Sequence, residues 1–151
     1  MHEIDHIAAA VTDLEAAREA FVTTTDAEHV WTTESEEWGY RTGYFLAGSD
    51  MFTLIEPMTD ESFMASYIEQ RGPGFHHIGV NVDDLEATIE RMTAAGGEVI
   101  MEDTIPGVRE EATLHPKSWF GLQVQVIEWH DDVGPTARDH IEALRAHKEG
   151  E

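Results

Sequence analysis

Two histidines hold equivalent places in two similar stretches of this 151-residue chain. His6 lies in the stretch DHIAAAVTDLEA and His77 in the stretch HHIGVNVDDLEA, so the second follows the first at an offset of 71 residues. The similarity returns at an offset of 72, where TLIE (53–56) matches QVIE (125–128). Solenoid repeats are shorter than this. The two nearly equal offsets therefore indicate a duplicated supersecondary module.

The duplication places four polar side chains at equivalent strand positions. His6 and His77 lie on the first strands of the two copies, and Thr53 and Gln125 lie on the last strands. If the copies pair by pseudo-twofold symmetry, we expect these side chains to converge in one concave, sheet-lined site. Two neutral imidazoles with oxygen ligands suit a divalent ion such as Zn, Co, Ni, Mn or Fe, with positions left open for water or substrate.

The four residues differ in how well they suit metal binding. A lone histidine on a strand is more often structural, but two at the same place in a duplicated module favour metal binding. Thr53 is a poor metal ligand, and a strand-favouring residue is its simpler interpretation. Gln125 lies in the alternation Gln-Val-Gln-Val, and an inward amide indicates a polar site. We therefore predict His6, His77 and Gln125 as the metal ligands.

The other histidines are not expected at this site. His76 should face away from His77 because side chains alternate along a strand. Apart from His115, which is considered below, the other five lie near element ends or turns and are expected to have no role there: His2, His29, His130, His140 and His147.

Each copy reads as a βαβββ module. An apolar strand is followed by an acidic turn that can cap a helix, then by a helix and three strand candidates. In the first copy we expect strands at 4–11, 27–33, 40–47 and 51–57 and a helix at 14–23. In the second copy we expect strands at 75–82, 98–103, 110–114 and 122–129 and a helix at 85–95.

The modules set the expected domain organisation. We predict one α+β domain with module one at 1–60, a helical linker at 61–72, module two at 73–131 and a helical extension at 132–151. Two tandem βαβββ modules forming a cupped mixed sheet around a metal site are the expected fold, with the helices segregated to one side of the sheet.

The charge balance is strongly acidic. The chain has 31 Asp and Glu against 9 Lys and Arg, a formal net charge of −22, and its acids are spread along its whole length. Such self-repulsion destabilises a compact state in dilute buffer, while molar salt shortens the Debye length to about 3 Å. This composition is typical of a protein from a salt-accumulating halophile.

Composition also restricts location and partners. Nucleic acid and anionic membrane need a basic surface and are therefore not expected as partners. The chain has no cysteine, so disulfides and thiolate metal sites are excluded. No apolar run is long enough to cross a bilayer, and the first residues do not read as a signal peptide. We expect a cytoplasmic protein.

Several motifs are similar to those of one enzyme family. The entry DHI with a following DLE resembles the vicinal oxygen chelate (glyoxalase/bleomycin resistance/dioxygenase) superfamily. GPGFHHI (72–78), IEP (55–57), IPG (105–107) and LHPKS (114–118) resemble its methylmalonyl-CoA epimerase branch. The resemblance covers residues 1 to about 130.

The resemblance implies paired βαβββ modules around a divalent metal held by a histidine and a Glu or Gln from each module. His6 and His77 match this pattern. Gln125 stands where the epimerases usually have Glu, and Thr53 stands where they have Glu or Gln. The loop around Val108 is also shorter than in the epimerases.

The implied reaction is removal of a proton next to a thioester carbonyl, with a carboxylate from each module exchanging that proton. Glu37 matches the first-module acid, although a solvated charge in an acidic stretch is an equal interpretation. The second acid would be Gln125 and is therefore missing. Glu111 and His115 are its candidate replacements, whereas Glu128, three residues after Gln125, is not offered as a substitute.

The resemblance further implies a small-molecule substrate, an acyl-CoA, and a homodimer. Few cations could meet the phosphates of CoA, and the candidates are Arg41, Arg71, Arg109 and Lys117. Alternatives remain open: a dioxygenase or a lyase of the same fold on another small substrate, or a metal-free binding protein. Measuring whether the protein binds metal would distinguish the metal-free binding protein from the enzymes. Identifying the metal would distinguish an oxygenase from an epimerase.

Overall fold

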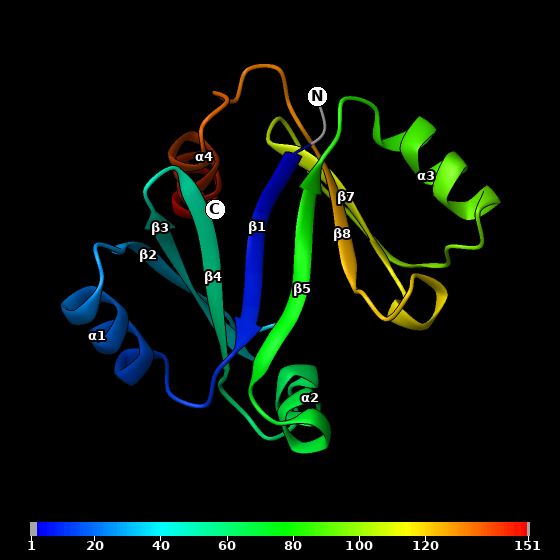
Figure 1. Ribbon diagram of the computed structural model, residues 1–151. Coiled ribbons are helices and arrows are strands. Elements are labelled where there is room, and N and C mark those ends of the chain that lie inside the picture. Colours follow the sequence, from blue (N-terminus) through cyan, green and yellow to red (C-terminus); the bar gives the residue numbers. More distant parts are fainter. Residues whose placement is uncertain (1–2, 151) are drawn as a thin grey trace. The chain divides into compact units, whose positions relative to one another are not determined.

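A computed structural model describes residues 3–150 of the chain, which carry eight strands and four α-helices (Figure 1). In chain order these are β1 (Glu3–Ala10), α1 (Leu14–Thr24), β2 (Glu28–Ser35), β3 (Tyr40–Ala47), β4 (Asp50–Pro57), α2 (Phe63–Arg71), β5 (Gly74–Asn81), α3 (Leu85–Ala94), β6 (Val99–Ile105), β7 (Arg109–Leu114), the 3₁₀ turn η1 (Pro116–Ser118), β8 (Val124–Trp129) and α4 (Ala137–Glu149). Every helix and strand expected from the sequence is present, and the ends lie within two residues of the prediction except at α4, which begins at Ala137 although the helical extension was expected from residue 132. The predicted α+β class and the repeated βαβββ order are confirmed.

The chain divides into two compact units, one of residues 7–76 and one that joins the residues up to 6 with those from 77 onward. In the 7–76 unit the strands are ordered β2-β3-β4-β1, with antiparallel pairs β2–β3 and β3–β4. In the other unit the order is β1-β5-β8-β7-β6, where β5 and β8 are parallel and β6–β7 and β7–β8 are antiparallel. The module boundaries expected from the sequence stay a prediction.

The duplicated helices begin in the same way. Asp13 caps α1 by accepting from the Ala16 backbone N–H, and Asp84 caps α3 by accepting from that of Ala87. A strand carboxylate adds a second acceptor in each copy. Glu56 on β4 accepts from the Leu14 backbone N–H, and Glu128 on β8 accepts from that of Leu85. The acidic turns thus start helices that the last strand of the same module holds in place.

Apolar clusters fix each unit. In the 7–76 unit, Leu14 of α1 packs with Phe45 of β3 and Leu54 of β4, and Met64 of α2 packs with Ala8, Ala10 and Ile55. In the other unit, Val82, Val124 and Val126 form a cluster against which α3 packs through its Leu85, Ile89 and Met92. Burial of these side chains, worth about 25 cal/mol per Å² of apolar surface, holds each helix on its sheet. No helix within residues 3–150 has both the length and the apolar character that crossing a membrane requires.

Candidate functional site

Two imidazole rings meet edge to face on adjacent strands. His6 on β1 is buried and His77 on β5 is half-buried. Their Nε2 atoms are 3.1 Å apart, and their ring planes are inclined by 89°. The two histidines singled out by the duplication are therefore brought together within one compact unit.

The spacing of the two nitrogens fits shared coordination. Two metal–nitrogen bonds of about 2.0–2.1 Å would reach both Nε2 atoms from one point at an angle of roughly 95–100°. That angle is close to the one between neighbouring positions of an octahedral site, which leaves room for oxygen ligands. The donor set of two neutral imidazoles therefore suits a divalent ion, although the ligand roles themselves stay a prediction.

A buried carboxylate fixes the His6 ring. Asp5 Oδ2 accepts a hydrogen bond from His6 Nδ1 at 2.6 Å. Its other oxygen accepts from Trp129 Nε1 and from His140 Nδ1, each at 3.0 Å. Since a neutral imidazole has one N–H, donation from Nδ1 leaves the His6 Nε2 lone pair directed toward His77.

The same contacts keep Asp5 ionised. Burial would raise the pKa of the Asp5 carboxyl, yet hydrogen bonds from His140 and His6 hold that pKa well below its ordinary value. Asp5 therefore acts as an acceptor only, and it cannot offer its neighbours a proton at neutral pH.

Gln125 is held with its carbonyl oxygen free. On β8 it is paired with Gly79 of β5 on one side and with Thr113 of β7 on the other. Its amide Nε2 donates to Glu111 Oε2, and both side chains are buried. Because an ionised carboxylate only accepts hydrogen bonds, the amide nitrogen must face Glu111 and Oε1 is left to bind another group.

Arg109 lies beside the carboxylate of Glu111. Arg109 Nη2 is 3.0 Å from Glu111 Oε2, and its guanidinium lies over the Trp129 ring at 5.1 Å. The Arg109 Nε is buried and has no hydrogen-bond partner among residues 3–150. Glu111 is thus the predicted replacement acid that lies next to Gln125. His115 instead accepts from the Lys117 backbone N–H at η1.

Glu128 is directed away from Gln125, because its carboxylate accepts from the Leu85 backbone N–H at the start of α3. Glu37 is exposed in the turn between β2 and β3, and Thr53 is buried on β4 opposite Tyr44. Both belong to the 7–76 unit, and their roles stay predictions.

His140, which was not expected at this site, contacts one of its residues. It is buried in α4, bonded to Asp5 and stacked on Trp129 with ring centroids 4.0 Å apart. Sequence reasoning missed it because α4 has no copy in the first module.

His76 is buried and packs on Tyr67. His29 and His130 bond to Thr32 and Asp132, whereas His2 lies outside the described residues.

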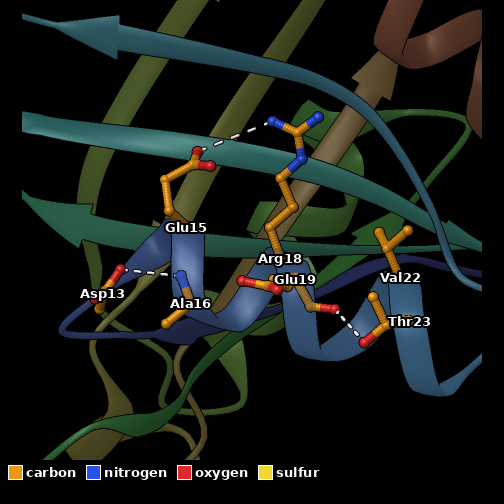
Figure 2. Close-up of a pocket in the computed structure, with 7 residues that line it drawn as sticks. All are labelled: Asp13, Glu15, Ala16, Arg18, Glu19, Val22 and Thr23. Carbon is orange, nitrogen blue, oxygen red and sulfur yellow. Dashed lines mark hydrogen bonds and ion pairs between the residues drawn. The ribbon is translucent and has the colours of Figure 1, made fainter.

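Two other features do not form part of the site. Within residues 3–150 no group of three His, Cys, Asp or Glu side chains is arranged to hold a metal. A surface hollow is lined by residues of α1 and its cap, as Figure 2 shows, and it includes none of the candidate site residues.

Comparison with known sequences defines the class of protein. Residues 5–114 match the Glyoxalase/Bleomycin resistance protein/Dioxygenase superfamily, and the chain belongs to this family. Among curated relatives, the ethylmalonyl-CoA/methylmalonyl-CoA epimerase of Cereibacter sphaeroides is 28% identical over 82% of this chain and 95% of its own length. A probable lactoylglutathione lyase of Vibrio cholerae is 28% identical over 84% of this chain and 91% of its own.

Solved structures that match this chain also include methylmalonyl-CoA epimerases. A hypothetical protein of Bacillus halodurans matches with a TM-score of 0.79 and 25% identity, over 89% of this chain and 99% of that one. A methylmalonyl-CoA epimerase in complex with methylmalonyl-CoA and ammonium matches with a TM-score of 0.74 and 25% identity, over 88% and 97% of the two chains. A Streptomyces coelicolor methylmalonyl-CoA epimerase variant bound to 2-nitronate-propionyl-CoA matches with a TM-score of 0.72 and 26% identity, over 83% and 95%.

Proposed function

We propose that this chain is a metal-dependent epimerase that removes and returns the proton next to the thioester carbonyl of a 2-substituted malonyl-CoA. The observation that carries the proposal is the 3.1 Å approach of His6 Nε2 to His77 Nε2, each from the first strand of its copy. The epimerases among its sequence relatives and structural neighbours support this substrate class.

Three side chains would hold the ion. His6 and His77 supply nitrogen, and Gln125 supplies its carbonyl oxygen while Glu111 holds its amide nitrogen. When bound, the divalent ion polarises substrate oxygens and stabilises the negative charge that develops as the proton leaves. Gln125 cannot accept that proton, because an amide is not a base at neutral pH.

Epimerisation needs a proton carrier on each face of the reacting carbon. We assign one role to Glu37, the first-module acid. The other role is assigned to Glu111, which is buried beside Gln125 and held by Arg109. A carboxylate on one face takes the proton and the acid on the opposite face returns one, so the configuration inverts with no net change in composition.

The net charge of −22 opposes a polyanionic CoA ester. Molar KCl screens exposed charges beyond about 3 Å, so we expect binding to improve with salt. Assays should therefore be made at high KCl.

The test follows the proton directly. Chelator-treated protein is incubated in D₂O and molar KCl with one epimer of methylmalonyl-CoA, with and without added Co²⁺ or Zn²⁺. Mass spectrometry reports deuterium at the α carbon, and a stereospecific mutase reports inversion. We expect metal-dependent exchange that His77→Ala abolishes, and inversion that Glu111→Gln abolishes while one-sided exchange remains.

No exchange in a protein that binds metal tightly would overturn this assignment. In that case a lyase or an oxygenase reaction on another small substrate becomes the next candidate. Protein that binds the CoA ester with no response to metal would instead indicate a metal-free binder.

A further inference from the structure

The C-terminal helix brings a histidine to Asp5. α4 begins at a capping box in which Thr136 and Asp139 bond to each other's backbone N–H at 3.1 and 3.0 Å. Its buried residues are His140, Ile141 and Leu144. This helix lies beyond residues 5–114, the part of the chain that matches the family.

His140 is tied to the site from two sides. Its Nδ1 donates to Asp5 Oδ1 at 3.0 Å, and its ring stacks on Trp129 with an interplanar angle of 16°. The Trp129 Nε1 lies 3.0 Å from both Asp5 Oδ1 and Asn81 Oδ1. The stacked pair thus presents two N–H donors to one carboxylate oxygen.

Because its carboxylate is held in this way, Asp5 also fixes the orientation of the His6 ring. With Oδ1 held by His140 and Trp129, the remaining oxygen is directed at His6 Nδ1, 2.6 Å away. Asp5 is fully buried, so water does not compete for these contacts. Rotation of the carboxylate would break all three of these hydrogen bonds to a charged group at once.

We propose that His140 is a positioning residue for metal binding, which acts through Asp5 to hold the His6 imidazole with its Nε2 lone pair directed at the ion. The proposal rests on the metal site of the proposed function. A carboxylate that accepts from the second nitrogen of a ligating histidine fixes its tautomer and raises its basicity, and the loss of such a partner typically lowers metal affinity.

The alternative is that His140 only docks α4. Both roles would lower stability when the side chain is removed, but only the positioning role changes metal affinity in protein that remains folded. His140→Phe keeps a ring to stack on Trp129 and removes the donor. His140→Asn restores an N–H donor close to the position of Nδ1. Glu142→Ala, at an exposed position of α4, is the matched control.

The test is titration of chelator-stripped protein with Co²⁺ in molar KCl, beside thermal unfolding of the metal-free forms. We expect His140→Phe to weaken Co²⁺ binding by about 10- to 100-fold. His140→Asn should recover most of that loss, and Glu142→Ala should bind as the wild type does.

A second measurement needs no variant. Nitrogen-15 NMR of the metal-free wild type should place the His6 proton on Nδ1. A proton on Nε2, or a folded His140→Phe protein that binds Co²⁺ within about twofold of wild type, would overturn the inference. If His140→Phe does not fold, His140→Leu, which also lacks the donor, takes its place in the Co²⁺ titration.

These outcomes are separate from those of the proposed function. Absence of α-proton exchange in a protein whose Co²⁺ affinity depends on His140 would overturn the epimerase and leave the positioning role intact. Exchange that proceeds with Co²⁺ affinity independent of His140 would do the reverse.

Discussion

The imidazole of His6 lies directly over Gly79. A Cβ placed on Gly79 would come within 2.5 Å of His6 Cε1 and 2.6 Å of His6 Nδ1. The ring cannot simply swing aside, because Asp5 holds Nδ1 and the side chain is buried. Gly79 is also the register partner of Gln125, so the absence of a side chain there lets His6 pack beside the amide.

Gly79→Ala should therefore damage the site and the fold together. We expect a loss of about 1–3 kcal/mol in the free energy of unfolding, which is typical of overpacking, and weaker Co²⁺ binding. Urea denaturation in molar KCl and Co²⁺ titration measure the two effects. In the His6→Ala background the clash is gone, so adding Gly79→Ala there should cost much less stability than it does in the wild type. Simple additivity of the two changes would contradict the clash.

Gln125→Glu should destabilise the metal-free protein. The amide that donates to Glu111 is replaced by a second carboxylate, and two buried like charges at hydrogen-bond distance repel. We expect a loss of about 1–3 kcal/mol, as for other broken buried hydrogen bonds, and partial recovery when Co²⁺ is added. Thermal unfolding with and without metal measures both.

The exchanged pair Glu111→Gln/Gln125→Glu provides the control for this change. It restores one amide and one carboxylate, so its metal-free stability should exceed that of Gln125→Glu alone. Equal stability of the two variants would show that the contact between residues 111 and 125 does not matter.

The carboxylates of Glu56 and Glu128 should contribute similarly to their two helices. Each accepts from the first backbone N–H of a helix, at 2.6 Å for Leu14 and 2.8 Å for Leu85. Replacement by Ala should cost about 0.5–2 kcal/mol at either position, the range of lost N-terminal caps, and replacement by Gln should cost less. Urea denaturation checks this. Glu128→Ala is the cleaner measurement, since Glu56 also pairs with Arg41 at 3.3 Å.

His29 should titrate below the ordinary histidine value. Burial lowers its pKa, and the positive charge of Arg18 adds to this effect. Because the folded state binds this proton less readily than the unfolded state, the contribution of His29 to stability is present above the ordinary pKa and is lost as pH falls through the folded pKa. NMR titration should find the lowered midpoint, and Arg18→Gln should raise it. A midpoint unchanged by Arg18→Gln would argue against the role of that charge.

The sequence was sufficient for the features that the duplication repeats. His6 and His77, an acidic turn before each helix, and the order of elements could all be predicted, because the two copies agree. Gln125 was singled out by the alternation along β8, and Glu128, which was not offered as a substitute, lies on the other side of the strand.

Features that occur once could not be predicted in this way. His140 contacts Asp5 across 135 residues, in a helix with no copy in the first module. The contact between Gln125 and Glu111 depends on the register of β7 and β8, which pairs Gln125 with Thr113. Alternation predicts the faces of a strand but not the register between two strands. A histidine on the buried face of α4, among Ile141 and Leu144, was the one available signal for His140.

The position of Asp5 and His6 in the chain has a consequence for biosynthesis. These residues are translated before their partners His77, Trp129 and His140, which follow by as many as 135 residues. At a ribosomal rate of about 5–20 residues per second, roughly 7–27 seconds pass between the synthesis of Asp5 and that of His140. Until its neighbours β4 and β5 have been made, β1 is an unpaired strand, open to capture by chaperones or by other nascent chains. The contact of Asp5 with His140 therefore becomes possible well after that of His6 with His77.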